Sequence, residues 1–156
     1  MRTFNTQIIK YGALVFLGLM SYFLIMDAFD LVHNLNLRIF NAVIMFSGIF
    51  LLLKRYKKQD YDKPFSYLNG LTAGFFVTLI GTGAFAIFMT IYLLMNPEFV
   101  IEIKETEPQG MYLNIPAMVM LILIEGIGSG ILFTYTSMQF LKADVAVEGN
   151  RPSSAD

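Results

Sequence analysis

One carboxyl group, Glu125, is the residue of this sequence best placed to do chemistry. Throughout 113–141 it is the sole acidic or basic side chain in an otherwise apolar stretch. A charged carboxylate at the centre of a membrane costs roughly 2.5–3.5 kcal/mol on insertion scales. We therefore expect Glu125 to be protonated and to play a structural role. Ser129, Thr78 and Thr82 are the candidate hydrogen-bond partners. The alternative interpretation is an intramembrane site that binds or moves a proton or a cation.

Other combinations of reactive side chains are weak. Asp27, Asp30 and His33 follow one another at intervals of three, so a continued helix would align them, but a fourth metal ligand is missing. We expect a solvent-exposed helix end there and no metal site. The chain has no cysteine and a single histidine, which leaves no nucleophile–base pair. The sequence thus predicts no catalytic residue, no cofactor and no enzymatic activity.

An acidic segment covers residues 98–110 and carries Glu98, Glu102, Glu105 and Glu107. These acids do not have the spacing of an EF-hand calcium loop. The sequence predicts a solvated loop, in which the alternating residues 99–103 form a short strand or an interfacial segment.

The composition indicates membrane helices. Hydrophobic residues make up 56% of the 156 positions, against 45–50% in soluble domains, and they gather in four blocks. We predict an all-α fold, a polytopic transmembrane bundle of four helices over about 8–28, 38–54, 70–95 and 113–141. The first block resembles a signal peptide, but no small-residue cleavage site follows, so we expect it to stay as a helix. Residues 1–142 form one domain, and 143–156 a disordered polar cytoplasmic tail.

Small residues indicate which helix faces pack together. Gly126 and Gly130 form a small-xxx-small pair that permits close helix approach, and a stripe of small residues in the third helix is the expected partner. The predicted helix-packing residues are Gly74, Thr78, Gly81, Thr82, Gly126, Ser129 and Gly130. Polar and small positions of the second helix should also face the bundle; they are Asn41, Ser47 and Gly48. The bulky arc of the last helix should face lipid; it comprises Met120, Ile124, Ile127, Ile131 and Met138.

A basic cluster follows the second apolar block: Lys54, Arg55, Lys57 and Lys58. Such a cluster at a membrane surface determines topology and attracts anionic lipid headgroups. With four crossings, nine of the eleven Lys and Arg residues lie on one side. That side is expected to be the cytoplasm, with both termini inside. The net charge of −1 gives no reason to expect a nucleic-acid partner.

The segment FSYLNGLTAG at 65–74 and the apolar run at 75–92 resemble an uncharacterised family of small bacterial four-helix membrane proteins, a domain of unknown function. The Lys10-Tyr11-Gly12 start, the basic loop after the second helix and the glycine-bearing last helix belong to the same pattern. The resemblance covers about residues 8–142. It implies a location in the bacterial inner (cytoplasmic) membrane, and because the family has no assigned activity it assigns no functional role to any residue.

Two functions from different classes follow from these features. The first is an accessory, assembly or scaffolding subunit of a larger membrane complex, or a homo-oligomer, with the lipid bilayer and other membrane subunits or a second copy as partners. The alternative is a small proton- or cation-coupled transporter or channel that uses Glu125. Substituting Glu125→Gln discriminates them, because it keeps the volume and hydrogen bonding but removes the titratable proton.

Overall fold

The computed structural model describes residues 2–29, 31, 37, 39–59, 67–106 and 112–148; of residues 2–5, 58–59, 106 and 142–148 only the backbone is described. The described chain forms five helices: α1 (Arg2–Ala28), α2 (Ile39–Gln59), α3 (Tyr67–Met95), α4 (Pro97–Thr106) and α5 (Ile115–Glu148). Four of them are long and apolar enough to cross a membrane, with spans of Thr6–Ala28, Ile39–Lys57, Tyr67–Met95 and Ile115–Leu141. The predicted four-span, all-α bundle is confirmed. Within the described ranges there is no strand.

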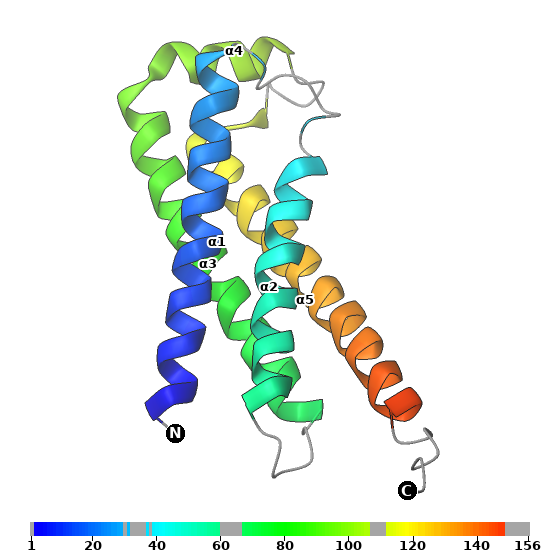
Figure 1. The fold of residues 1–156 in the computed structure, drawn as a ribbon. Helices are drawn as coiled ribbons and strands as arrows, with labels where there is room; N and C mark the ends of the chain where they lie inside the picture. Colours follow the sequence, from blue (N-terminus) through cyan, green and yellow to red (C-terminus); the bar gives the residue numbers. More distant parts are fainter. Residues whose placement is uncertain are drawn as a thin grey trace, which may run out of the picture.

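Two expectations about the helices are wrong. The segment 99–103 lies in α4, not in a loop or strand, and α4 lies across one end of the bundle (Figure 1). Pro97 and Glu98 favour a helix start at this point, because proline suits the first turn and an acid complements the helix dipole. In addition, α5 runs on to Glu148, so the first part of the predicted disordered tail is helical. Residues 149–156 lie outside the described chain.

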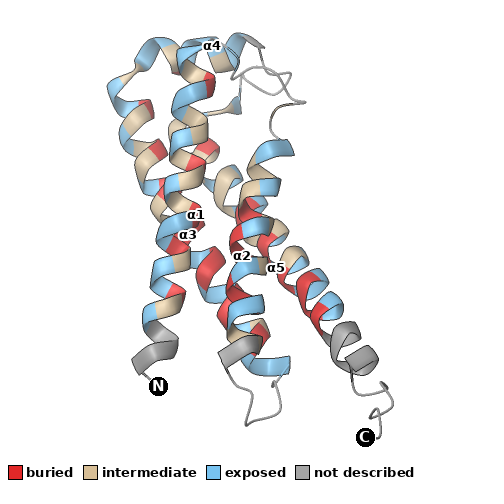
Figure 2. Cartoon of the chain, viewed as in Figure 1, coloured by how far each residue is buried: buried red, intermediate tan, exposed pale blue. Residues whose placement is uncertain are grey.

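Helix α3 is the centre of the bundle. It packs against α1 on one side and α5 on the other, and α2 contacts both α1 and α5. Of its most apolar stretch, 39% is buried, against 11% in α5. Buried residues therefore line the inner faces of the helices, while α5 is buried along one side only (Figure 2).

Close packing of α1 depends on glycines in its neighbours. Val15 is fully buried, and a Cβ on either Gly48 of α2 or Gly81 of α3 would overlap its side chain. One valine thus fills the space that two glycines leave open, and it holds the three helices together. Gly48 faces the bundle as expected, whereas Ser47 is exposed, contrary to expectation.

An aromatic cluster joins α1, α3 and α4 at the end of the bundle where α4 lies. The ring of Phe23 meets those of Tyr92 and Phe99 edge to face, with centroids 5.0 and 6.0 Å away. The Tyr92 hydroxyl donates a hydrogen bond of 2.7 Å to Asp27 Oδ2, so a polar contact accompanies the ring packing. The same cluster includes Phe85 and Phe88.

The opposite end has one described link between α2 and α5. Lys57 Nζ donates a 3.1 Å hydrogen bond to the backbone carbonyl of Leu141. Leu141 lies within α5, so the lysine bonds a carbonyl along the side of that helix and ties the last turns of α2 to it. The start of α1, the end of α2, the start of α3 and the end of α5 all lie at this end of the molecule (Figure 1).

Candidate functional site

The α3–α5 interface interlocks threonines with glycines. A Cβ on Gly126 would overlap the Thr82 side chain, and one on Gly130 would overlap that of Thr78. The pattern reverses one turn further, where Gly74 of α3 lies against Thr134 of α5. Each threonine methyl group occupies the space left by a missing side chain, so the two helices approach closely without a void.

The other two predicted packing residues have different neighbours. Gly81 lies against Val15 of α1 and so does not face α5. Ser129 turns toward α2, where its hydroxyl lies 3.6 Å from the sulfur of Met45. The predicted set is therefore divided between the α3–α5 contact and two further contacts.

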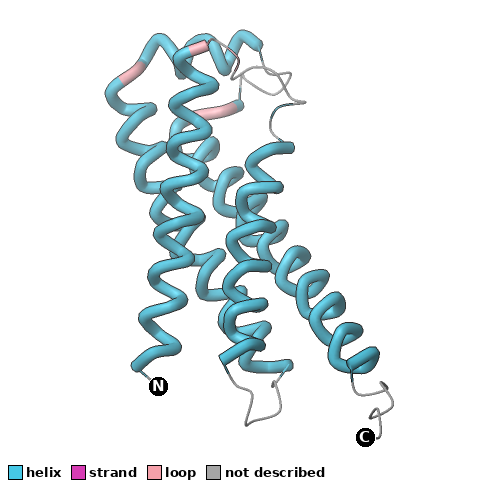
Figure 3. Tube along the Cα trace, in the orientation of Figure 1, coloured by secondary structure: helices cyan, strands magenta, loops and turns pink. Residues whose placement is uncertain are grey.

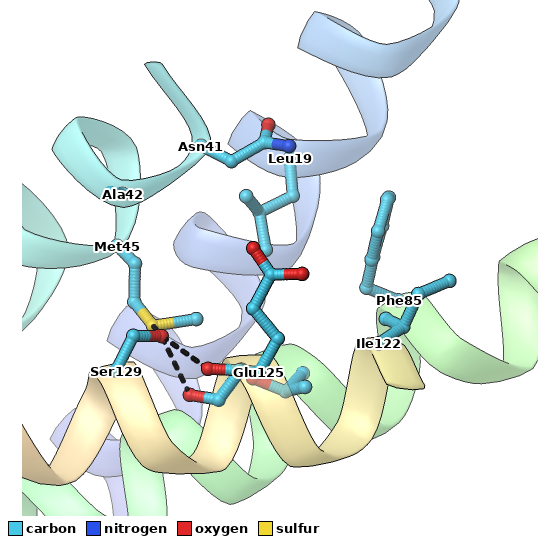
Figure 4. Close-up of a pocket in the computed structure, with 10 residues that line it drawn as sticks. Leu19, Asn41, Ala42, Met45, Phe85, Ile122, Glu125 and Ser129 are labelled. Carbon is cyan, nitrogen blue, oxygen red and sulfur yellow. Dashed lines mark hydrogen bonds between the residues drawn. The ribbon is translucent and has the colours of Figure 1, made fainter. Parts of the chain in front are cut away.

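A polar pocket lies beside this interface, inside the span of the bundle. Its volume is about 130 Å³, and it is lined by residues of α1, α2, α3 and α5. Apolar and small groups make up most of the wall: Leu19, Ala42, Met45, Phe85, Ile122 and Gly126. Four polar residues complete it: Asn41, Thr82, Glu125 and Ser129. The Glu125 side chain extends from α5 between Leu19 and Phe85, below Asn41 (Figure 4).

Burial differs between the two sides of this pocket. Thr82 is 2% exposed, whereas Glu125 is exposed. The pocket thus has a closed floor at Thr82 and a mouth at Glu125. A carboxyl at the mouth of a polar recess is in the position where intramembrane ionisable groups commonly contact a substrate or an ion.

The hydroxyl of Thr82 is an exception among the threonines of α3 and α5. Five others donate to the backbone carbonyl four residues earlier, at 2.7–2.9 Å: Thr72, Thr78, Thr90, Thr134 and Thr136. Thr82 Oγ1 has no hydrogen-bond partner although it is buried. Asn41 Oδ1, across the same pocket, is buried and without a partner as well. The two residues that carry these buried oxygens therefore line one pocket.

Two of the three expected hydrogen-bond partners of the Glu125 carboxyl donate elsewhere. The Ser129 hydroxyl donates to the backbone carbonyls of Glu125 and Gly126, at 2.7 and 3.2 Å. The Thr78 hydroxyl donates to Gly74 O. Serine and threonine in membrane helices commonly make such local bonds, because the carbonyl of the preceding turn is always within reach. Thr82 alone of the three lies on the pocket with its hydroxyl unengaged.

The remaining candidate residues are placed as follows. Asp27 accepts the bond from Tyr92, whereas Asp30 and His33 lie outside the described residues. Among the residues that the structure describes, no group of three His, Cys, Asp or Glu is arranged to hold a metal ion. Lys54 and Arg55 are exposed on the last turns of α2. The side chain of Lys58 is outside the described part.

The lipid-facing arc expected for α5 is wrong at Met138. This residue is 1% exposed, so it belongs to the core. Its neighbours Ser137 and Leu141 are buried as well, so this part of α5 is packed on a side that an ideal 100° wheel assigns to lipid (Figure 3).

Sequence analysis missed the combination that makes the pocket. Asn41 was expected to face the bundle, and Glu125 and Thr82 were expected at similar depth, but nothing in their spacing pairs Asn41 with Glu125. Whether the two residues line one pocket depends on where α2 begins relative to α5, which is a property of the packed bundle. The signal that was available is chemical: an amide near the start of an apolar helix must find a polar neighbour.

Four apolar helices around an intramembrane polar pocket define a small multi-pass membrane protein. Residues 10–115 match a family described as "Protein of unknown function (DUF4199)". The match covers more than half of the chain, which therefore belongs to this family, and the expected uncharacterised family is confirmed. The match ends at the first residue of α5, so Asn41 and Thr82 lie inside it and Glu125 lies beyond it. No curated protein and no solved structure is significantly similar to this chain.

Proposed function

We propose that this protein acts by helix association within the membrane, as an accessory, assembly or scaffolding subunit of a larger complex or as a homo-oligomer. The observation that carries the proposal is the exposure of Glu125 in the middle of a helix of which only 11% of the apolar stretch is buried. Ionisable residues in membrane spans almost always face a bundle interior or a cavity. A second chain on this side of α5 would enclose the carboxyl.

The outer side of α5 has a shape suited to such a contact. A Cβ on Gly128 would have no neighbouring atom within 4 Å, and Leu121, Leu132 and Tyr135 are exposed on the same side. A glycine between large apolar side chains forms a shallow depression into which another helix packs well. This side is opposite the Gly126 and Gly130 contacts with α3, so association through it leaves the bundle intact.

We further place the protein in the bacterial inner membrane with both termini in the cytoplasm. The distribution of Lys and Arg supports this orientation: Lys10, Lys54, Arg55 and Lys57 all belong to the end of the bundle at which α1 starts. No catalytic step is part of the proposal, because the sequence offers no nucleophile–base pair.

The experiment that tests association is native purification in mild detergent, with mass determination and identification of every co-purifying chain. We expect a particle that contains more than one 17.7 kDa chain or a stoichiometric membrane partner. In the matched variant Gly128→Leu, that particle should dissociate while the helix content and the thermal stability of the single chain persist. A wild-type protein that is monomeric and alone, both in detergent and in lipid nanodiscs, contradicts the proposal.

A small proton- or cation-coupled transporter is the second candidate, and the pocket beneath Glu125 favours it. The discriminating experiment compares wild type with Glu125→Gln in sealed vesicles under a pH or cation gradient. Gradient-driven flux in the wild type that disappears in Glu125→Gln supports the transporter. Equal permeability of both proteins and of protein-free vesicles counts against it.

A further inference from the structure

The two unsatisfied oxygens of the pocket call for a bound group. A buried polar atom without a partner costs about 1–3 kcal/mol, so such atoms usually bind a water molecule or an ion. Thr82 Oγ1 and Asn41 Oδ1 are buried oxygens of residues on different helices, α3 and α2, and both residues line the same 130 Å³ cavity. That volume is sufficient for an ion with one or more of its water molecules.

The polar groups of the pocket are all oxygen ligands of the kind that hard cations prefer. They are the amide oxygen of Asn41, the hydroxyls of Thr82 and Ser129, and the carboxylate of Glu125. No nitrogen or thiolate ligand that would select a transition metal is among the lining residues. Met45 contributes a thioether, which is a poor ligand for an alkali or alkaline-earth ion and faces the Ser129 hydroxyl.

Charge balance selects a monovalent ion. Glu125 is the one titratable residue that lines the pocket: α1 contributes Leu19, α2 contributes Asn41, Ala42 and Met45, and α3 contributes Thr82 and Phe85. A single carboxylate neutralises one positive charge, whereas a divalent ion would keep an unbalanced charge in a medium of low dielectric constant. From these observations we propose that the Glu125–Asn41–Thr82 pocket binds one monovalent alkali cation, of which Na⁺ is the reference case.

Glu125 provides the one carboxyl group among the residues that line the pocket, so the binding of a cation there depends on this side chain. This inference is independent of whether the protein transports the ion, and independent of what covers the mouth of the pocket.

The test is equilibrium binding of radioactive ²²Na⁺ to the purified full chain in nanodiscs, with N-methylglucamine chloride maintaining ionic strength. We expect saturable binding of up to one ion per chain, displaced by unlabelled Na⁺. Parallel displacement by Li⁺, K⁺ and Ca²⁺ measures selectivity, and we expect Ca²⁺ to compete least. In Glu125→Gln, saturable binding should be lost.

Matched valine substitutions test whether the Thr82 hydroxyl takes part in cation binding. Thr82→Val keeps the shape that packs on Gly126 but removes the unpartnered oxygen, and it should weaken binding about fivefold to tenfold. Thr78→Val removes a hydroxyl one turn away that already donates to Gly74, and binding should be unchanged. Thermal unfolding of each variant without added Na⁺ verifies that it is folded.

Three results would overturn the inference. The first is the absence of saturable, displaceable ²²Na⁺ in folded wild type at neutral and alkaline pH, which would leave water as the occupant of the pocket. The second is equal binding by wild type and Glu125→Gln. The third is an equal loss in Thr78→Val and Thr82→Val, which would attribute the effect to packing. None of these results depends on the oligomeric state, so failure here is distinct from failure of the proposed association.

Discussion

At the scale of single residues, the absence of a side chain at three glycines decides how α3 and α5 meet. Gly74, Gly126 and Gly130 each lie against a threonine methyl group of the opposite helix, so that even one added carbon atom has no room. By contrast, a Cβ added to Gly83 or to Gly128 would have no neighbouring atom within 4 Å. The chain therefore contains its own controls for the effect of close packing.

Substituting Gly130→Ala should destabilise the bundle by about 1–3 kcal/mol, because the new methyl group overpacks against Thr78. Reversible unfolding in mixed detergent and SDS micelles measures the free energy of unfolding. The matched substitution Gly83→Ala adds the same atom where nothing lies within 4 Å and should change that free energy little. Equal stabilities of the two variants would mean that α3 and α5 are not in close contact at Gly130.

Asp27 and Tyr92 supply a polar link between α1 and α3. In Tyr92→Phe the ring contacts with Phe23 and Phe99 remain, but the 2.7 Å hydrogen bond is lost, and we expect a loss of about 0.5–1.5 kcal/mol. The exposed Tyr112 provides the control, since Tyr112→Phe should leave the same unfolding measurement unchanged. If Tyr92→Phe left the free energy of unfolding unchanged, the contact between α1 and α3 near α4 would depend on ring packing alone.

At the scale of elements, hydropathy predicts the four spans because a membrane helix must be apolar over its whole crossing. The same criterion misses α4, whose ten residues include three glutamates and one lysine. It is amphipathic, with Val100 buried and Ile101 exposed, so its structure depends on the bundle end that it covers. Its stability comes from tertiary packing, which hydropathy does not report.

The helix ends and the pocket could not be predicted from the sequence either, because they too depend on features that hydropathy does not report. Helices α1, α2 and α5 extend past the apolar blocks at Arg2, Gln59 and Glu148, because polar residues continue a helix in water without interrupting its hydrogen bonds. Glu125 stands out in the sequence because its charge is unusual there. Asn41 becomes important only when the packing of α2 places it across from Glu125 (Figure 4).

At the scale of the whole molecule, orientation follows from the even number of crossings. The start of α1 and the end of α5 lie at the end of the molecule that carries Lys54, Arg55 and Lys57 (Figure 1). An alkaline phosphatase domain fused to the C-terminus should be inactive, because this enzyme requires export from the cytoplasm. Inserted between α4 and α5, the same domain should be active. The reverse pair of activities would invert the topology.

The two proposals concern different parts of the same region, namely the inside of the pocket and the outer side of α5. The cation site requires the floor of the pocket at Thr82, which belongs to the single chain. Association requires the outer side of α5, where Glu125 stands at the mouth. A second chain on this side would close the mouth and remove water from the carboxylate and the cation alike, so its attraction and desolvation terms oppose each other. The two proposals are therefore tested separately.

The most direct test of association is photo-cross-linking in the native membrane. A benzoylphenylalanine at position 128 should form cross-links to protein, either a second copy or a stoichiometric partner, because the proposed association places another chain on this side of α5. The same group at position 17, where Leu17 of α1 is 55% exposed, should react with lipid only. Protein adducts at position 128 and none at position 17 are the predicted result. Lipid adducts alone at both positions would contradict the account.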